Sequence, residues 1–276
     1  MIILEPSVSQ TVQKCTLQAA YNKAEFAGRI CYNSIDKMIP GKGGTNEGFI
    51  KGLLAKGHYS PLAHGAIYLT IPRNVRGYNV NSIIEILTKD TFFTNTVKTA
   101  ENWYITTNLR VLHEHFSQDE VNSLQPFIDN PTQYHDIYYT FRVQTSIGVT
   151  RELNRHAAYL AICEQSTRWC NFSKKEDGEV YFVKPWYYDL NPEAAKVWEE
   201  SCKQSENAYM KLLEQGNKPD VARGVLNLST RSIVIYSAPK SKWKHVLELR
   251  SPELGAKNVH PDCAVIADKI KEFIYE

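Results

Sequence analysis

The order of helix-like and strand-like segments limits the architectures open to this chain. Apolar residues at helical spacing predict helices from Asn46 to Gly57, from the Asn191-Pro192 pair to Gly216, and after Pro261. Runs rich in β-branched and aromatic residues predict strands over Ala66–Ile71, Trp103–Thr107, Tyr138–Val143, Val180–Val183 and Ser232–Tyr236. The strands are separated by long helices in irregular order, without a glycine-rich phosphate loop or a repeating βαβ period. The pattern therefore favours an α+β fold over a doubly wound parallel sheet.

The chain has no obvious internal boundary. Neither a low-complexity linker, an internal repeat nor a shift in composition divides its 276 residues. Hydrophobic residues make up 43% of it, which is enough to form a sizeable core. We therefore expect one domain over residues 1–276.

The charge balance excludes some classes of partner. Thirty-two Lys and Arg against 30 Asp and Glu give a net charge of +2, which gives no electrostatic reason to expect a nucleic-acid or membrane-surface binder. No apolar run approaches the roughly 18 residues of a membrane span, and the N-terminus lacks the layout of a signal peptide. We expect a soluble, cytoplasmic protein that acts on neither nucleic acid nor membranes.

The cysteines and histidines give little reason to expect a metal. The six cysteines contain no CxxC pair and are typical of free thiols in a reducing compartment. His113-Glu114-His115 lacks a third ligand at a suitable spacing, so a solvated segment is the simpler interpretation. We predict no metal site.

The densest polar cluster lies between Gly148 and Lys174. A helix beginning near Val149 would place Glu152, Arg155 and His156 on one face. The segment Glu164-Gln165-Ser166-Thr167-Arg168 follows, and its hydroxyls, backbone N–H groups and guanidinium suit a phosphate monoester. From composition alone, a solvated face with ion pairs one helical turn apart remains the alternative.

Three further segments contain isolated polar residues. Arg223 lies in the apolar run VARGVL, and Arg250 ends the segment HVLELR. His58 and His64 flank a Ser-Pro turn in GHYSPLAH, just before a predicted strand. Taken singly, each arginine is more typical of a structural ion pair, and each histidine of a structural residue.

Taken together, the four elements GHYSPLAH, RHA followed by EQSTRW, ARGVL and HVLELR resemble the ordered motifs of the flavin-dependent thymidylate synthases. The resemblance covers about residues 20 to 250, because FAGRICYNSIDK, NWYITTNLRV and CNFSK are also similar to this family. It implies the thymidylate synthase-complementing fold, with a central, mostly antiparallel sheet and long flanking helices. It also implies a homotetramer in which subunits share FAD and nucleotide sites.

The resemblance implies roles residue by residue. Arg250 would be the catalytic residue that polarises the uracil ring at N3. The residues implied in FAD binding are His64, Ala66, Arg155, His156, Glu164 and His245. The residues implied in binding deoxyuridine monophosphate (dUMP) are Glu152, Asn154, Arg155, Glu164, Gln165, Ser166, Thr167, Arg168, Arg223 and Arg250, with Ser166 and Arg168 on the phosphate.

The sequence also departs from the family pattern. Ala157 stands where the third signature residue is usually Arg, and one extra residue separates His156 from Glu164, which predicts a bulge or a shifted turn. Other departures are Ala63 for Glu, Trp169 for Tyr, and Pro239 and Ser241 where the family can have Asn and Arg. These changes affect the predicted FAD site more than the nucleotide site.

The implied reaction is reductive methylation of dUMP to dTMP, a methyltransferase reaction. Methylenetetrahydrofolate would donate the carbon, and NADPH would reduce the FAD. The flavin-free thymidylate synthases need a nucleophilic cysteine after a proline, and no cysteine here follows one. Two alternatives remain open: a relative that methylates or hydroxymethylates another pyrimidine nucleotide, and a non-catalytic nucleotide- or RNA-binding module.

Overall fold

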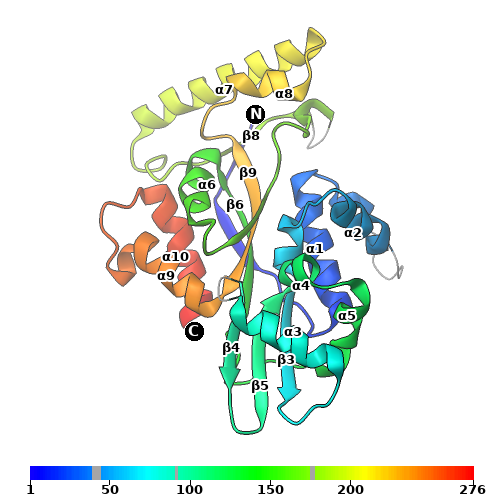
Figure 1. The fold of residues 1–276 in the computed structure, drawn as a ribbon. Coiled ribbons are helices and arrows are strands. Elements are labelled where there is room, and N and C mark those ends of the chain that lie inside the picture. The colour runs from blue at the N-terminus through cyan, green and yellow to red at the C-terminus, as the bar shows by residue number, and fades with distance from the viewer. Residues whose placement is uncertain (39–44, 91–92, 175–177) are drawn as a thin grey trace.

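The computed structural model describes residues 1–38, 45–90, 93–174 and 178–276. Within these residues the strands form three sheets (Figure 1). The largest is antiparallel and has the order β2-β6-β9-β7, from strands Ser7–Gln10, Tyr138–Ser146, Arg231–Pro239 and Ala161–Glu164. The second is also antiparallel and has the order β3-β5-β4, from Ala66–Pro72, Asn102–Asn108 and Asn95–Lys98. The third pairs β1 (Ile2–Leu4) with β8 (Tyr181–Val183) in parallel.

Helices surround these sheets. They are α1 (Leu17–Cys31), α2 (Thr45–Ala55), α3 (Tyr78–Lys89), α4 (Leu109–His115), α5 (Gln118–Ser123), α6 (Ile147–Leu153), α7 (Pro192–Glu214), α8 (Pro219–Ala222), α9 (Lys240–Arg250) and α10 (Pro261–Tyr275). Short 3-10 turns relevant to the site are η2 (Ser60–His64), η4 (Asn154–His156) and η7 (Arg223–Val225). No helix among the described residues is both long and apolar enough to cross a membrane.

Strand β9 lies inside the four-stranded sheet and is buried on both faces. Val234, Tyr236 and Ala238 pack in the cluster formed with α6, α9 and α10, whereas Ile233 and Ile235 pack against α1. This alternation is the two-residue period of a strand. A strand covered on both faces appears in the sequence as a nearly continuous apolar run, which explains why the sequence reveals it.

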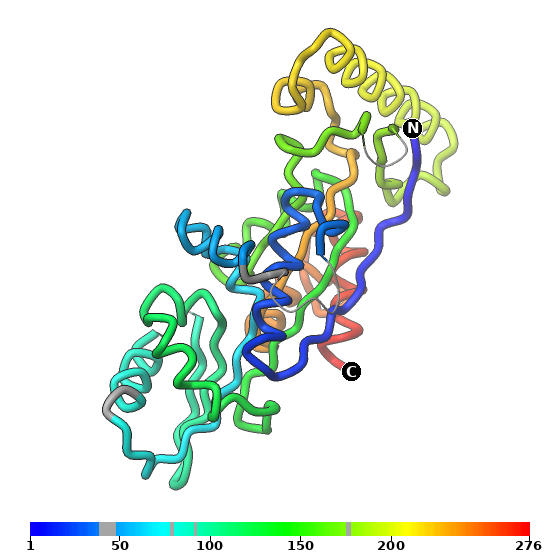
Figure 2. The backbone as a smooth tube through the Cα atoms, turned by 90° about the vertical axis from the view of Figure 1, so that its right-hand side faces the viewer, coloured from blue at the N-terminus to red at the C-terminus, as the bar shows by residue number. Residues whose placement is uncertain are grey.

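The remaining sheets occupy opposite ends of the molecule. The β3-β5-β4 sheet lies at the lower end of Figure 1, and its buried cluster includes residues of α1 to α5. At the other end, α7 packs through Trp198 and Tyr209 on a cluster that includes Phe182 of β8. Figure 2, turned by 90°, shows the same separation between these two ends. The four-stranded sheet therefore connects them.

The α+β class and the mostly antiparallel pairing are confirmed. The first residue of each predicted strand lies within one residue of the first residue of an observed strand. The predicted helix starts and stops also agree with the structure. The Asn191 side chain caps α7 by accepting from Ala194 N at 3.1 Å, and Gly57 follows α2 with φ +67°. These features were predictable because they depend on local backbone chemistry.

The prediction that Glu152, Arg155 and His156 share one helix face is wrong for Arg155, whereas Glu152 and His156 lie on a common side, where both contact Arg250. The helix α6 ends at Leu153, and Asn154–His156 form the 3-10 turn η4, in which His156 is buried while Arg155 is exposed. A 3-10 turn has about 3.0 residues per turn instead of about 3.6, so the side-chain directions change.

The extra residue before Glu164 is accommodated in a turn. Tyr159 N and Leu160 N both donate to His156 O, at 2.8 and 3.0 Å. The strand β7 then pairs in regular register with β9 from Ala161 to Glu164. The structure thus has the shifted turn, and the strand itself has no bulge.

Gly65, directly after η2, allows a close approach between α1 and α4. A Cβ atom at this position would lie 2.6 Å from the backbone oxygen of Ala20 and 2.8 Å from Leu109 Cδ1. We expect Gly65→Ala to lower the free energy of unfolding by about 1–3 kcal/mol, because a backbone atom cannot give way as a flexible side chain can. Urea denaturation followed by circular dichroism measures this change.

The matched control is Gly52→Ala in α2, where an added Cβ would meet nothing within 4 Å. This variant should gain up to about 1 kcal/mol, since alanine favours helix more than glycine does. Equal stability of Gly65→Ala and wild type would contradict the tight contact at Gly65.

Candidate functional site

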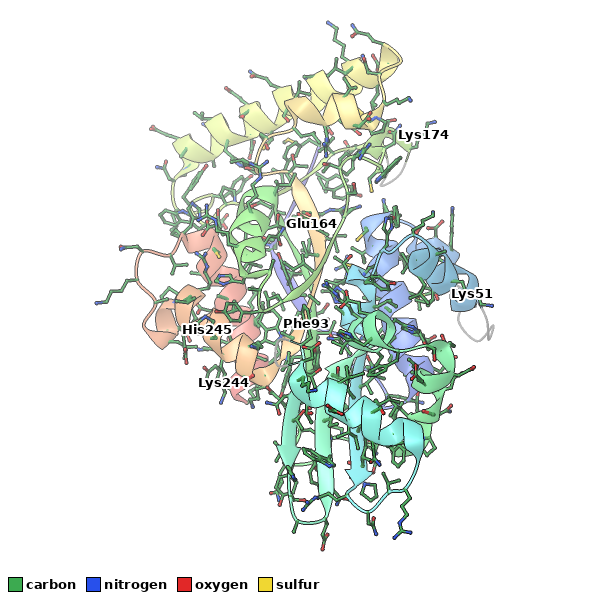
Figure 3. All side chains as sticks on the ribbon, viewed as in Figure 1. Lys51, Phe93, Glu164, Lys174, Lys244 and His245 are labelled. Atoms are coloured by element: carbon green, nitrogen blue, oxygen red, sulfur yellow. The ribbon has the colours of Figure 1, made fainter. Side chains whose placement is uncertain are left out.

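Glu164, the last residue of β7, is surrounded by donors from three other elements. Its Oε1 accepts from Thr150 Oγ1 of α6 and from Ser232 Oγ of β9, each at 2.7 Å. Its Oε2 accepts from Asn154 Nδ2 of η4 at 2.8 Å. Hydrogen bonds to a charged acceptor are stronger than neutral ones. Glu164, near the middle of the view in Figure 3, is therefore held in one orientation.

Tyr236 extends this network into the core. Its hydroxyl donates to Asn154 Oδ1 at 2.8 Å, which leaves the Asn154 amide group directed at Glu164. Burial, with a smaller effect from the Glu164 charge, raises the pKa of Tyr236 well above its ordinary value. The phenol therefore remains a neutral donor. Because Tyr236 donates to the Asn154 oxygen, the Asn154 nitrogen is left to donate to Glu164, and the chain of hydrogen bonds sets the orientation of each side chain.

An open cavity of about 310 Å³ lies beside the Glu164 carboxylate. Its lining residues come from α6, the end of β7 and η7: Ile147, Thr150, Arg151, Glu164, Gln165, Ser166, Thr167 and Arg223. Across it, Arg223 Nη1 donates to Thr167 Oγ1 at 3.4 Å. A second cavity, of about 400 Å³, shares Ile147, Arg151, Thr167 and Arg223 with the first. One chain therefore brings Arg223 to the Glu164–Thr167 segment without a second subunit.

The residues after Glu164 differ in exposure. Gln165 is buried, and its Oε1 accepts from Arg231 Nη2 at 3.5 Å. The backbone N of Ser166 donates to Cys31 O at the end of α1, at 3.0 Å. Arg168 is exposed, lies 5.1 Å over the ring of Trp169, and lines neither cavity. The structure thus brings Glu164 to Thr167 to the cavity and leaves Arg168 outside it.

Arg250 forms a separate cluster at the end of α9. Its Nε donates to His156 Nε2 at 2.9 Å, its Nη1 contacts the Glu152 carboxylate at 3.2 Å, and its Nη2 donates to the Glu152 carbonyl at 3.4 Å. Burial, followed by the charges of Arg250 and His245, lowers the pKa of His156 to about 4. His156 is therefore neutral at pH 7, with Nε2 as an acceptor for Arg250.

A set of rings and cations lies next to His156. Tyr159 contacts His245 with ring centroids 4.5 Å apart, and Lys242 Nζ lies 5.6 Å from the Tyr159 ring. Figure 3 shows His245 on α9, at the lower left and away from Glu164. Arg155, which directly precedes His156 in the sequence, is exposed to solvent. The predicted site residues thus fall into at least two groups on one chain.

His64 and Ala66 lie in the interior. His64 has no exposed surface, its Nδ1 lies 2.7 Å from Ser237 Oγ, and its Nε2 has no partner among the described atoms. Burial, with a smaller effect from Lys23, lowers the pKa of His64 to about 3, so it is neutral. Ala66 begins β3 and accepts at its carbonyl from Gln13 Nε2, at 2.7 Å. In a single chain His64 is therefore closed to a ligand, whereas Ala66 lines a separate cavity of about 200 Å³ together with Gln13 and Tyr68.

Sequence reasoning gave no role to four residues that shape the site, although Arg151 lies in the polar cluster that it singled out. Thr150, Ser232 and Tyr236 hold Glu164 and Asn154, and Arg151 lines both cavities. Thr150 and Arg151 lie one turn after Ile147 in α6, so a helix starting two residues earlier than expected would have placed them together. Ser232 and Tyr236 share the β9 face with Val234, but only the pairing with β7 brings that face to Glu164.

The sequence matches one known protein family. The family model of the thymidylate synthase complementing protein matches residues 132–276, more than half of the chain. The chain belongs to this family. The matched range contains every predicted site residue except His64 and Ala66.

Two curated relatives have related names. A probable flavin-dependent thymidylate synthase of Paramecium bursaria Chlorella virus 1 is 27% identical over 152 residues, which cover 51% of this chain and 69% of the relative. A flavin-dependent thymidylate synthase of Mycobacterium avium (strain 104) is 48% identical over 48 residues, which cover 17% of this chain and 19% of the relative. The second match thus spans about a fifth of that relative.

Among solved structures, a UMP/dUMP methylase, PolB, from Streptomyces cacaoi bound with 5-Br dUMP is similar over 99% of this chain and 91% of its own, with 16% identity and a TM-score of 0.47. The same methylase bound with 5-Br UMP has a TM-score of 0.46. Within the described part of this chain, no group of three or more His, Cys, Asp and Glu side chains is placed to hold a metal ion.

The His156–Arg250 contact predicts how stability depends on pH. The unfolded chain takes up a proton on this histidine near pH 6.5, and the folded protein only near pH 4. The unfolded state therefore binds more protons between these values, and the free energy of unfolding should fall as pH drops from 6.5 to 4. The contribution of one histidine is at most about 1.4 kcal/mol per pH unit.

His156→Gln keeps an acceptor for Arg250 Nε but does not titrate, so its stability should depend less steeply on pH in this window. Thermal or urea unfolding from pH 4 to 7 measures the difference, and His64 contributes equally to both proteins. His58→Gln, at an exposed histidine, is the control. Parallel curves for wild type and His156→Gln would refute the neutral His156.

Proposed function

We propose that this protein methylates C5 of dUMP to give dTMP, with methylenetetrahydrofolate as carbon donor and FAD, reduced by NADPH, as hydride carrier. The observation that carries the proposal is the cavity of about 310 Å³ in which the Glu164–Thr167 segment faces Arg223. Its size lies at the lower end of the roughly 300–1,000 Å³ of small-molecule sites. A compact nucleotide with one phosphate suits it.

The residues around the cavity divide into two chemical halves. Arg223 and the hydroxyls of Ser166 and Thr167 supply donors for a phosphate. Glu164 supplies an acceptor for a polar edge of a nucleoside, and Asn154, outside the lining, positions it by donating to its Oε2 at 2.8 Å. The proposal therefore assigns nucleotide binding to this segment, to Asn154 and to Arg223.

Arg250 is the proposed catalytic residue. A guanidinium has five N–H donors, of which three contact His156 and Glu152. One donor therefore remains on each terminal nitrogen, and the pair would match O2 and N3 of a uracil ring that has lost its N3 proton, because N3–H is itself a donor. A fixed cation there would stabilise the negative charge that develops on the ring during attack from C5. Glu152 and His156 would hold Arg250 in place for this step.

The residues near His156 fit part of a flavin nucleotide. Tyr159 and His245 offer ring faces, and Lys242 and exposed Arg155 offer charge for phosphates, although Ala157 adds none. His64 does not fit in a single chain, since it has no exposed surface, and Ala66 lines a different cavity from Glu164 and Arg223. When bound, FAD would supply the hydride. The protein would orient the rings and keep water from the reacting carbon.

We further propose that residues 1–276 act as one domain and assemble into a homotetramer with shared sites. Leu228, which lines the larger cavity, is 55% exposed, and Trp169 and Val221, each two residues from a lining residue in the sequence, are 63% and 57% exposed. Exposed apolar residues gathered at a site are typical of an interface. A second subunit covering them would also enclose a site that is open in one chain.

Two other functions have specific support. Ala157 and the turn that follows it alter the surroundings of the predicted FAD site, which supports action on another pyrimidine nucleotide or transfer of a hydroxymethyl group. A non-catalytic nucleotide-binding module would retain the cavity and need neither flavin nor folate.

Product analysis separates these possibilities. The protein is incubated with methylenetetrahydrofolate, FAD and NADPH, and with either dUMP or UMP, and the products are identified by mass spectrometry. We expect dTMP from dUMP, and visible flavin absorbance on the purified protein. A methylated UMP or a hydroxymethylated product would favour the first alternative. Nucleotide binding without flavin or product would overturn the enzymatic proposal.

The role of Arg250 makes a second prediction. Arg250→Lys keeps a positive charge but loses the planar pair of donors and cannot contact His156 and Glu152 together. Turnover should fall about 10²–10³-fold, while dUMP affinity changes little, because the donor acts mainly in the transition state. Single-turnover flavin oxidation and dUMP titration measure the two effects. Arg76→Lys, at an exposed arginine outside the site, is the control. Turnover within threefold of wild type would exclude this role.

A further inference from the structure

We propose that Arg151, to which neither the motif resemblance nor the comparisons give a role, binds the phosphate of the nucleotide together with Arg223. This inference rests on the proposed function, because it names the group that recognises the anionic end of the same substrate. The two cavities share a border. Arg151 and Arg223 line both, with Thr167 and Ile147 beside them.

The fold directs Arg151 to this border. The Ser146 side chain caps α6 by accepting from Val149 N at 3.3 Å, and the backbone N of Ile147 donates to Thr230 O at 2.9 Å. These bonds fix the start of the helix. Residues one turn later, Thr150 and Arg151, therefore share a face with Ile147. Thr150 on that face reaches Glu164, and Arg151 reaches the cavities.

The larger of the two cavities has cationic side chains and no acidic ones in its lining. The cations are Arg151 and Arg223. The smaller cavity also contains Glu164, whose hydrogen bonds come from neutral groups of Thr150, Ser232 and Asn154 and do not cancel a carboxylate charge, so the anion is expected on the side of the larger cavity. Among the described residues, Arg151 makes no ion pair, and Arg223 has only its long bond to Thr167. An anion between the two guanidinium groups would relieve their mutual repulsion.

Phosphate is the anion that this arrangement suits. A guanidinium presents a planar fork of donors that matches two phosphate oxygens, and two such groups can contact one phosphate. The Thr167 and Ser166 hydroxyls on the same wall would add neutral donors. Arg168, which the resemblance implies for the phosphate, stacks on Trp169 and lies outside both cavities. Arg151 therefore occupies the position that the sequence interpretation gave to Arg168.

Titration calorimetry tests this assignment with three probes: dUMP, deoxyuridine without phosphate, and inorganic phosphate. Arg151→Gln should weaken dUMP binding about 10–100-fold, the size expected when a charged hydrogen-bond donor is lost. It should leave deoxyuridine binding unchanged. Arg151→Lys should retain part of the affinity, since it keeps the charge without the fork. Arg76→Gln removes the same charge from an exposed position outside the cavities and should bind as wild type does.

The outcomes separate this inference from the proposed function. If wild type binds dUMP and Arg151→Gln binds it equally well, Arg151 is not a phosphate ligand and the proposed function stands. If wild type binds inorganic phosphate in an Arg151-dependent way but not dUMP, the phosphate site is supported and the proposed substrate is wrong. If wild type binds neither, both proposals fail. The unfolding curves of Arg151→Gln and Arg76→Gln should coincide. The two variants are then equally folded, and a difference in dUMP affinity between them reflects binding.

Discussion

The rest of the structure depends on one strand, β9, that is buried on both faces and paired on both edges. Its alternation sends Ile233 and Ile235 to α1, and Val234 and Tyr236 to α6, α9 and α10. A shift of one residue would exchange these two sets, so the register is strongly determined. The same register places Ser232 and Tyr236 on the face that carries Glu164, next to Thr150 of α6 and Asn154, the first residue of η4. The polar network of the site is thus a consequence of how the core packs.

This arrangement separates the proposed nucleotide-binding residues from the proposed catalytic arginine. The Glu164 network and the arginine-lined cavities lie on α6, β7 and η7, whereas Arg250 and His156 meet at the end of α9. Arg250 and Arg223 each keep N–H donors that make no hydrogen bond within the described residues. The network around Glu164 fixes an acceptor, and the contact between His156 and Arg250 fixes a cation. A nucleotide, a flavin or a second subunit would join the two groups from outside the single chain.

The sequence predicted much of this fold, because many of its signals are local. Asn191 before Pro192 and Gly57 after α2 act through their own backbone neighbours, and the apolar run of β9 reflects burial on two faces. The position of the polar cluster around Glu164 was also evident. The end of α6 was not, because the change from an α-helix to a 3-10 turn at Asn154 depends on its bonds to Glu164 and Tyr236, which are distant in the sequence.

The sequence by itself determined the fold class, the strands, the helix ends marked by caps and glycines, and the family to which its ordered motifs are similar. Tertiary structure alone decided which residues meet: Thr150 and Ser232 at Glu164, Arg151 opposite Arg223, and Arg250 against His156. Secondary structure follows from periodicity within a few neighbouring residues. A site follows from strand register and helix packing between segments tens of residues apart, and a single sequence carries no direct record of either.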